Sequence, residues 1–315
     1  MSEVITKQAY LDPDPRDYFE LLKPRVMRLV VFTALVGLLA APENIHPIIS
    51  FASILCVAVG AGACGALNMW WDADIDKIMK RTSSRPIPAG KVQPNTSLTI
   101  GLVLSFFSVI LLGLFSNYLA AGMLAFTIFF YIIIYTVWLK RLTTQNIVIG
   151  GLAGAFPPII GWIIATGEIS FESLLMCLII FVWTPPHFWA LSIFANSDYT
   201  KAKVPMLMVI KGEVITRKYI FYYSLLLSFI TILVSFTSIG GLFYLVSSVF
   251  LNAYFILLSF SILKVKDKSP ERNFEKERKF FLFSIFYLFS HFFFILFEAI
   301  LRKINFFSFN FLNVL

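Results

Sequence analysis

The chain has 315 residues, of which 58% are hydrophobic and only 14% are charged, and its mean hydropathy is +0.82. A soluble domain carries roughly 25% charged residues because its surface faces water. The composition therefore excludes a soluble enzyme, a nucleic-acid-binding protein and a disordered protein, and the net charge of +8 is attributed to membrane topology.

Apolar stretches recur along the chain, and a membrane-crossing helix needs about 20 apolar residues. They predict an all-α polytopic membrane protein with a single transmembrane domain over 26–300, an N-terminal tail over 1–25 and a C-terminal tail over 301–315. The nine expected spans are 26–42, 48–67, 96–116, 118–138, 146–166, 172–195, 218–237, 240–262 and 280–300.

Lysine and arginine residues alternate between the connections of these spans. Of the 26 basic residues, 24 fall in the N-terminal tail and in every second connection, and only Arg302 and Lys303 fall on the opposite side. Because basic residues are retained on the cytoplasmic side, we expect a cytoplasmic N-terminus. The N-terminal tail is rich in acidic residues, unlike a transit peptide, which favours a bacterial inner membrane over a mitochondrion.

Two cytoplasmic connections, 68–95 and 196–217, resemble each other at an offset of 124 residues. Asp72 aligns with Asn196, Asp74 with Asp198, and Lys77 with Lys201. The repeat predicts two four-helix halves in the same orientation, plus a ninth helix, around a central cavity with a site at the junction. Chance similarity between two polar connections is the alternative interpretation.

The first of these connections opens with polar residues at every fourth position, Asn68, Asp72 and Asp76. If the second span continues as a helix, they form one polar stripe that extends to Lys80, and Asp74 points elsewhere. Carboxylate and amide oxygens suit Mg²⁺, which binds one or two carboxylates together with substrate phosphates. The alternative is a solvated helix end.

Basic residues follow this acidic stripe. Arg81 and Arg85 lie within ten residues of Asp76, and guanidinium groups bind phosphate in a bidentate manner. A topological anchor would explain the two arginines but not the aspartates, so the pattern favours a diphosphate site at the membrane face. The second connection repeats the pattern more weakly, with Asp198, Tyr199, Lys201 and Lys203.

A histidine, His187, lies inside the sixth predicted span, directly after Pro185 and Pro186. The two prolines are expected to break the helix there. An ionisable residue within a span is a candidate functional group, and a hydrogen-bonded packing histidine is the alternative.

Four stretches carry a resemblance to a known family: KPRVMRLVVFTALVGLLAAP, NMWWDADIDKIMKRTSSRP, WTPPHFWALS and DYTKAKVPML. They resemble the protohaem IX farnesyltransferases, the haem O synthases among the UbiA-type intramembrane prenyltransferases, from about Lys23 to Leu207. The resemblance implies transfer of a farnesyl group from farnesyl diphosphate to a vinyl group of haem B, with Mg²⁺ as cofactor. Hand-over of the product to a haem A synthase or a terminal oxidase would follow.

The resemblance also implies roles for individual residues. The catalytic residues that the resemblance implies are Asp72, Asp76, Arg81, Arg85 and His187. The metal ligands would be Asn68, Asp72, Asp76 and Asp198, and the substrate contacts would be Asn68, Arg25, Asp198, Tyr199, Lys201 and Lys203, with Arg25 suited to a haem propionate. Ser197 stands where many members carry a further acid, so a second Mg²⁺ held by that connection is not expected.

Two other functions remain open at this point. A UbiA-type enzyme acting on an aromatic quinone precursor would share the acidic motif, although the TPPHFWALS and VPML segments favour haem. A secondary transporter would also show repeats and broken helices. Transporters gather polar residues near the middle of the bilayer, whereas here they lie at the cytoplasmic ends of the spans, which favours an enzyme.

Overall fold

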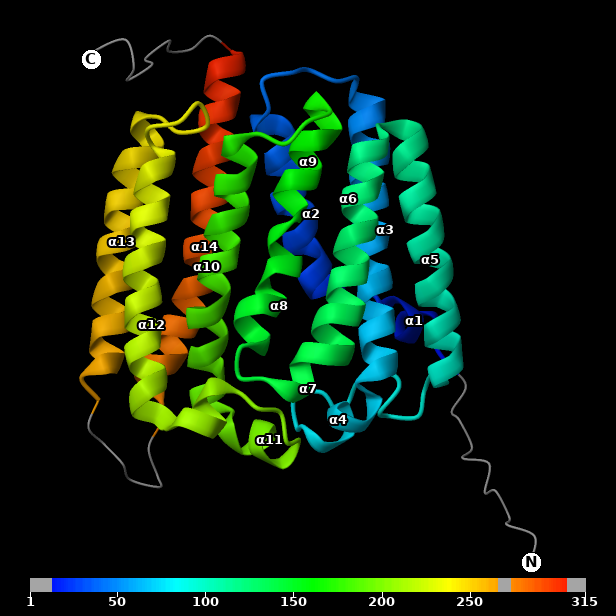
Figure 1. Cartoon of the computed structure of the whole chain (residues 1–315), viewed down its shortest axis with the longest axis vertical. Helices are drawn as coiled ribbons and strands as arrows, with labels where there is room; N and C mark the ends of the chain where they lie inside the picture. The colour runs from blue at the N-terminus through cyan, green and yellow to red at the C-terminus, as the bar shows by residue number, and fades with distance from the viewer. Residues whose placement is uncertain (1–12, 266–272, 305–315) are drawn as a thin grey trace, which may run out of the picture.

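The computed structural model of the chain describes residues 13–265 and 273–304, and every regular element in those ranges is a helix (Figure 1). The predicted tails therefore lie partly outside the described residues, at 1–12 and 305–315, as does part of the basic connection at 266–272. The helices, in chain order, are α1 (Pro15–Leu21), α2 (Pro24–Ala40), α3 (Pro47–Trp71), α4 (Ala73–Ile78), α5 (Pro94–Phe115), α6 (Tyr118–Phe129), the π-helix η1 (Phe130–Leu139), α7 (Lys140–Leu142), α8 (Asn146–Ala155), α9 (Pro157–Thr166), α10 (Phe171–Phe194), α11 (Asn196–Lys201), α12 (Leu207–Val234), α13 (Leu242–Leu263) and α14 (Glu275–Lys303).

The all-α membrane architecture is confirmed. In the described ranges, eight helical segments are long and apolar enough to cross a bilayer, with α6 to α7 and α8 to α9 each counting as one. The first predicted span coincides with α2, a 17-residue helix that lies inside the bundle beside α9 (Figure 1). The count of nine spans stays a prediction.

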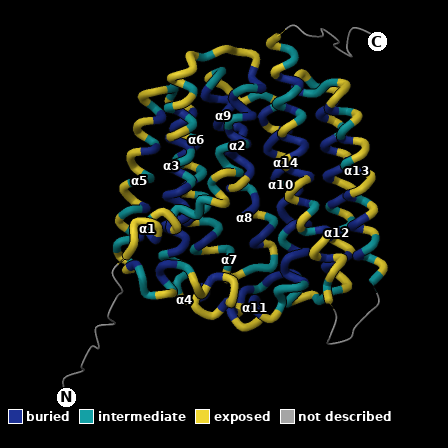
Figure 2. The backbone as a smooth tube through the Cα atoms, turned by 180° about the vertical axis from the view of Figure 1, so that it is seen from behind, coloured by how far each residue is buried: buried dark blue, intermediate teal, exposed yellow. Residues whose placement is uncertain are grey.

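The depth of each helix in the bundle differs. Within their most apolar windows, 78% of the residues of α8–α9 and of α10 are buried, against 17% for α5. The outward faces of the peripheral helices are exposed and apolar (Figure 2), with side chains such as Phe106, Leu114 and Phe250. Because so much apolar surface faces outward, the bundle is suited to a lipid environment.

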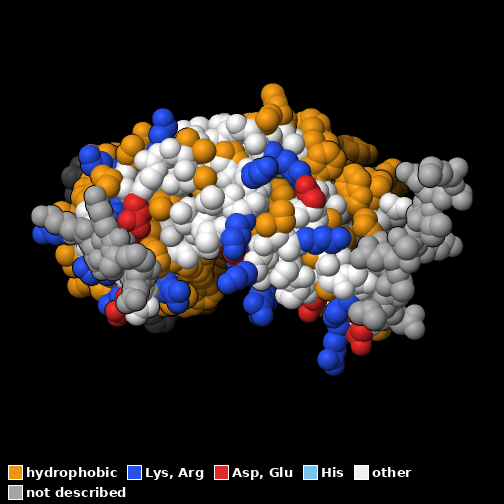
Figure 3. Space-filling model, turned by 90° about the horizontal axis from the view of Figure 1, so that it is seen from below, with side chains coloured by type: hydrophobic (Ala, Val, Ile, Leu, Met, Phe, Trp, Pro, Cys, Tyr) orange, Lys and Arg blue, Asp and Glu red, His pale blue; other side chains and the backbone are white. Residues whose placement is uncertain are grey.

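The short helices α4, α7 and α11 lie together at one end of the bundle, which we call the basic end, and α1 lies near it (Figure 1). Lysine and arginine side chains are spread over this face (Figure 3). The helix α14 ends at the opposite end of the bundle (Figure 1), and its last turn carries Arg302 and Lys303, the two basic residues expected on that side. The arrangement agrees with the alternation of charge that the sequence shows.

The predicted repeat reappears where α2 crosses α9. A Cβ atom on Gly37 would lie 2.1 Å from the carbonyl oxygen of Pro158, and one on Gly161 would lie 1.9 Å from the carbonyl oxygen of Ala34. Positions 37 and 161 are 124 apart, as are positions 34 and 158, which is the offset that aligns the two connections. Two equivalent helices therefore meet main chain to main chain, and each half donates the same glycine to the contact.

The two proline pairs behave differently. The fifth predicted span is divided into α8 and α9 directly before Pro157, as its prolines suggest. The break expected at Pro185 and Pro186 was wrong, because α10 continues through both prolines. Neighbouring helices enclose this part of α10, and packed membrane helices tolerate the loss of a backbone donor.

Gly161→Ala is expected to destabilise the folded protein by about 1–3 kcal/mol, because the added methyl group would push α2 and α9 apart. Thermal unfolding of the purified protein in detergent measures the effect. The matched control is Gly122→Ala, whose Cβ would have no atom within 4 Å and which gains the same helix propensity. Equal stability of the two variants would contradict the close crossing.

Candidate active site

The acidic motif lies where α3 ends and α4 begins, at the basic end. The expected continuous helix was wrong, because α3 stops at Trp71 and Asp72 leaves helical geometry with φ −87° and ψ 9°. The backbone N–H of Asp76 still donates to the carbonyl oxygen of Asp72 at 2.8 Å. The two aspartates therefore stay one turn apart, while Lys80 lies beyond α4 and is exposed.

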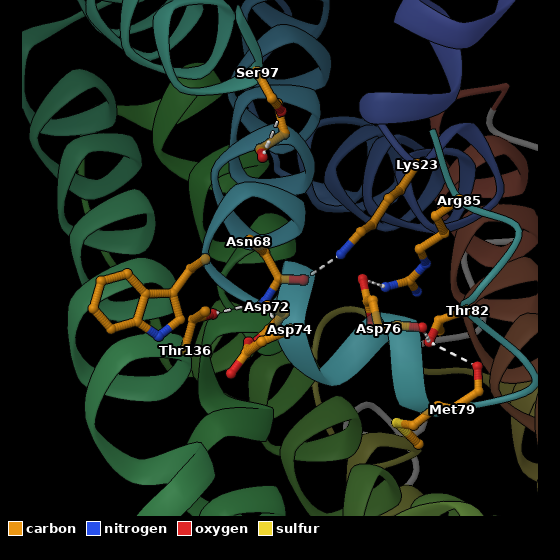
Figure 4. A network of polar contacts seen from close by, with 12 residues as sticks. Lys23, Asn68, Asp72, Asp74, Asp76, Met79, Thr82, Arg85, Ser97 and Thr136 are labelled. Carbon is orange, nitrogen blue, oxygen red and sulfur yellow. Dashed lines mark hydrogen bonds and ion pairs between the residues drawn. The ribbon is translucent and has the colours of Figure 1, made fainter. Parts of the chain in front are cut away.

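Both aspartates are buried, Asp72 with 0% and Asp76 with 2% of its surface exposed. The amide nitrogen of Asn68 donates to Asp72 Oδ2 at 2.9 Å, and Arg85 Nη1 forms an ion pair with Asp76 Oδ2 at 2.6 Å (Figure 4). A buried carboxylate requires such partners because its desolvation is costly. The structure thus brings together four of the predicted site residues, Asn68, Asp72, Asp76 and Arg85.

Asp74 points away from this group, as its position off the stripe predicts (Figure 4). Its side chain is 63% exposed, and both terminal nitrogens of Arg141 donate to its carboxylate at 2.8 Å. Partial burial acts to raise the pKa of Asp74, but the hydrogen bonds from Arg141, the charge of Arg141 and backbone hydrogen bonds together outweigh it and lower that pKa below its usual value. Asp74 therefore ties α4 to α7 at the surface.

Two lysines in the site were missed by the sequence analysis, which used them only as topology markers. Lys140 Nζ contacts Asp72 Oδ2, and Lys23 Nζ contacts Asn68 Oδ1. Burial, followed by the positive charges of Arg85 and Lys140, lowers the pKa of Lys23 to about 7. Both lysines lie at the ends of spans on the same membrane face as the aspartates, which is the signal that could have identified them.

The second connection meets the first at the basic end. Asp198 and Tyr199 are buried on α11, and an apolar cluster joins α4 to this connection through Ile75, Met79, Tyr199, Ala202, Val204 and Met206. Burial raises the pKa of Tyr199, and the positive charge of Arg81 opposes that shift. Arg81 itself is exposed. It acts on Tyr199 through its charge and has no ion-pair partner among the described residues.

The other predicted substrate contacts lie on the surface. Arg25, Lys201 and Lys203 are exposed, and within residues 13–265 and 273–304 none of them forms an ion pair. Arg25 is on the first turn of α2, two residues after Lys23, whose side chain reaches the acidic site. The roles of Arg25, Lys201 and Lys203 as substrate contacts stay predictions.

His187 is enclosed by aromatic side chains between α10 and α14. Its ring stacks on Trp183 at 4.3 Å and on Phe281 at 4.5 Å between ring centroids, and its Nδ1 lies 2.6 Å from Ser284 Oγ. Trp183 Nε1 donates to the carbonyl oxygen of the same serine at 2.7 Å. These contacts favour the packing interpretation, in which His187 joins α10 to α14.

An apolar pocket adjoins the acidic site. Its lining comes from α2, α3, α6 with η1, and α8 with α9, and includes Val30, Cys64, Tyr131 and Ile160. Lys23 also lines this pocket while its ammonium group contacts Asn68. One lysine therefore connects a polar, cation-rich site to an apolar space, an arrangement that suits a ligand with an anionic head and a hydrocarbon tail.

The acidic residues fit a magnesium ion that is shared with a phosphate ligand. Asp72 Oδ1 is buried and accepts no hydrogen bond, and its ion pair with Arg141 Nη2 is long, at 3.9 Å, which leaves it available for coordination. In the described part of the chain, no three His, Cys, Asp or Glu residues gather as a metal-binding group. Two carboxylates and an amide oxygen suit Mg²⁺ only when phosphate oxygens and water complete its coordination. Asp198, on α11, stays a predicted ligand.

Sequence comparison places the chain among known membrane enzymes. The model of the UbiA prenyltransferase family matches residues 30–285. A protein of Roseobacter denitrificans named protoheme IX farnesyltransferase is 58% identical over 287 residues, which cover 91% of each chain. One of the same name from Dinoroseobacter shibae is 56% identical over 294 residues and 93% of each chain.

Solved structures show the same fold. A structure concerned with digeranylgeranylglyceryl phosphate synthase superposes with a TM-score of 0.73 at 18% identity, and covers 90% of this chain and 98% of that one. A UbiA homologue from Archaeoglobus fulgidus, bound to DMAPP and Mg²⁺, superposes with a TM-score of 0.67 at 15% identity, with 89% and 99% covered. At these identities the likeness establishes the architecture.

His187→Ala is expected to destabilise the protein by about 1–3 kcal/mol, because it removes both the stacked ring and the hydrogen bond to Ser284. His187→Phe, which keeps the stack and loses only the hydrogen bond, should cost less. Thermal unfolding of the purified variants measures both effects. A His187→Ala protein as stable as the parent would contradict the packing role.

Proposed function

The chain belongs to the UbiA prenyltransferase family, and from this premise we propose that it transfers a farnesyl group from farnesyl diphosphate to a vinyl group of haem B. The products are haem O and diphosphate. The observation that carries the proposal is Lys23, which contacts the acidic site with its ammonium group and lines the apolar pocket. The site accommodates a diphosphate, and the pocket accommodates its isoprenoid chain.

The basic residues of the site neutralise the leaving group. As the allylic carbon–oxygen bond breaks, negative charge grows on the diphosphate, and Lys23, Arg85 and Lys140 lie around the place where it develops. Preorganised cations in a site shielded from water stabilise such charge strongly. In the free protein Arg85 and Lys140 are paired with Asp76 and Asp72, whereas Lys23 contacts the neutral amide of Asn68. Binding of the diphosphate would bring these cations a further anionic partner.

Asn68, Asp72 and Asp76 would hold Mg²⁺ together with the diphosphate oxygens. When bound, the metal ion supplies further neutralisation of the leaving group. The backbone N–H of Asp76 donates to the carbonyl oxygen of Asp72, one helical turn back, and both carboxylates are almost completely buried. This agrees with the Mg²⁺ recorded for the Archaeoglobus fulgidus homologue.

The apolar pocket protects the cationic carbon from water. Tyr131 lines it, and the face of an aromatic ring attracts a cation. The haem vinyl group donates its electron pair to the allylic carbon, which forms the new carbon–carbon bond. Water then adds to the remaining cation on the former vinyl group and releases a proton, which leaves a hydroxyethylfarnesyl substituent.

The identity of the acceptor rests on the relatives. Proteins that are 55–58% identical over at least 91% of this chain are named protoheme IX farnesyltransferase, which favours haem over an aromatic quinone precursor. The site also argues against a transporter, because Asp72, Asp76 and their cations lie at the basic end of the bundle.

The cellular setting follows from charge. We propose that the basic end faces the cytoplasm of a bacterium and that the chain resides in its inner membrane, because basic residues are retained on that side. Arg25, Lys201 and Lys203 are exposed at this end, where their charge would attract the diphosphate and the haem propionates. Transfer of haem O to a haem A synthase or a terminal oxidase would follow.

Membranes of cells that express the chain should convert haem B to haem O. Chromatography and mass spectrometry of the extracted haems detect the product, and cells that express Asp72→Asn serve as the control. If the membranes prenylate an aromatic acid and produce no haem O, the choice of acceptor is wrong.

Asp72→Asn and Asp76→Asn should each lower the rate of farnesyl transfer by about 10²–10³, since each removes charge that holds the metal and diphosphate. Asp74→Asn should lower it by less than about tenfold, because Asp74 is exposed and contacts Arg141. Steady-state assays on purified variants test the series. An equally large loss for Asp74→Asn would show that the off-stripe aspartate belongs to the site.

A further inference from the structure

The fourth predicted span changes its helical type half-way along. After α6, the ten residues Phe130–Leu139 form the π-helix η1, and α7 follows directly. π-helical segments are rare, are normally a single turn long, and occur frequently at functional sites. Neither proline nor glycine occurs in FYIIIYTVWL, so the sequence of η1 itself contains no helix breaker.

The π-helix determines which side chains share a face. Tyr131 and Lys140 are nine residues apart, which is two and a half turns of an α-helix with its 3.6 residues per turn, so an α-helix would place them on opposite sides. A π-helix, bonded from each residue to the fifth along, has roughly 4.4 residues per turn, so nine residues make about two turns. Tyr131 can therefore line the pocket while Lys140 contacts Asp72.

The exposed residues on the outward side of the same span are also four to five positions apart. Phe129, Ile133 and Trp138 are exposed on the outside of the bundle, with 45% of Ile133 and 58% of Trp138 accessible. Thr136 is completely buried on the inner face, between Tyr131 and Lys140 in the sequence. The inward side of this span thus carries Tyr131 at the pocket and, at the acidic site, Thr136 of η1 and Lys140 at the start of α7.

Thr136 makes a specific contact there. Its Oγ1 accepts a hydrogen bond of 2.9 Å from Asn68 Nδ2, which also donates to Asp72 Oδ2 at 2.9 Å (Figure 4). An amide nitrogen has two hydrogens, so both are engaged and the amide cannot rotate without losing a buried hydrogen bond. The amide oxygen of Asn68 is consequently turned towards Lys23.

We propose that Thr136 is a positioning residue, which the π-helical register of η1 brings to Asn68 so that the Asn68 oxygen faces the bound Mg²⁺ and diphosphate. This inference rests on the proposed function, because it assigns Asn68 Oδ1 to that complex. Without the hydroxyl group, Asn68 can turn and present a nitrogen, which cannot ligate a cation. Thr136 acts through Asn68 and does not itself contact the substrate.

The variant Thr136→Val removes the acceptor and keeps the branched shape, and Thr136→Ser keeps the hydroxyl group. Calorimetric titration of purified protein with inorganic diphosphate and Mg²⁺ should show up to about tenfold weaker binding for Thr136→Val, and affinity close to the parent for Thr136→Ser. The matched control is Thr99→Val on α5, whose hydroxyl donates only to the Asn95 carbonyl of its own helix. It should bind as the parent does.

A double-mutant cycle separates positioning from a general effect on the fold. In an Asn68→Ala background, Thr136→Val should cause no further loss of diphosphate affinity, because the side chain on which Thr136 acts is gone. An additive loss, or unchanged affinity in the single Thr136→Val variant, would overturn the inference. If Thr136→Val does not fold, Thr136→Ala takes its place in both comparisons.

The steady-state assay distinguishes this inference from the proposed function. A parent protein that binds Mg²⁺ and diphosphate but makes no haem O would overturn the reaction and leave the role of Thr136 intact. A parent that makes haem O, with Thr136→Val as active at limiting Mg²⁺ as the parent, would overturn the role of Thr136 alone. The expected result is a higher KM for farnesyl diphosphate in Thr136→Val and an unchanged KM for haem.

Discussion

The burial of two carboxylates is the constraint on which the site depends. Asp72 and Asp76 are almost completely enclosed, and removing an ionised carboxylate from water costs several kcal/mol unless a cation compensates. For Asp72 the compensating charge is Lys140, which is 68 positions away in the sequence, and for Asp76 it is Arg85, in the connection between α4 and α5. The charge balance of the site therefore exists only in the assembled bundle.

The connection that carries Arg85 is itself held in place from outside the bundle. Lys91 and Asp17 form an ion pair of 2.8 Å, and this pair lowers the pKa of Asp17. Leu21 of α1 packs with Ile87 and Val92 of the same connection. Although α1 contributes no group to the acidic site, it thereby supports the backbone from which Arg85 reaches Asp76.

Spacing predicted Arg85 as a phosphate ligand and not as the ion-pair partner of Asp76. Hydropathy, charge alternation and spacing were sufficient to predict the helical bundle, its basic end and the outward direction of Asp74. They were insufficient for Lys23, Lys140 and Thr136, because those roles depend on which helices become neighbours. The end of α3 at Trp71 has no proline or glycine to mark it, and the stacking partner Phe281 of His187 comes from α14, far along the chain. Apart from the helix end, these misses concern contacts between distant segments, which local pattern does not encode.

The crossing of α2 and α9 has a consequence for how the two halves differ. The closest approach of the halves there is between carbonyl oxygens and glycines, where an added Cβ atom would clash with main chain. Substitutions elsewhere in one half can therefore accumulate without disturbing the axis that relates it to the other. The first connection has three aspartates, whereas the second has one, Asp198. A scaffold joined through its main chain permits one copy to specialise in charge while its counterpart diverges.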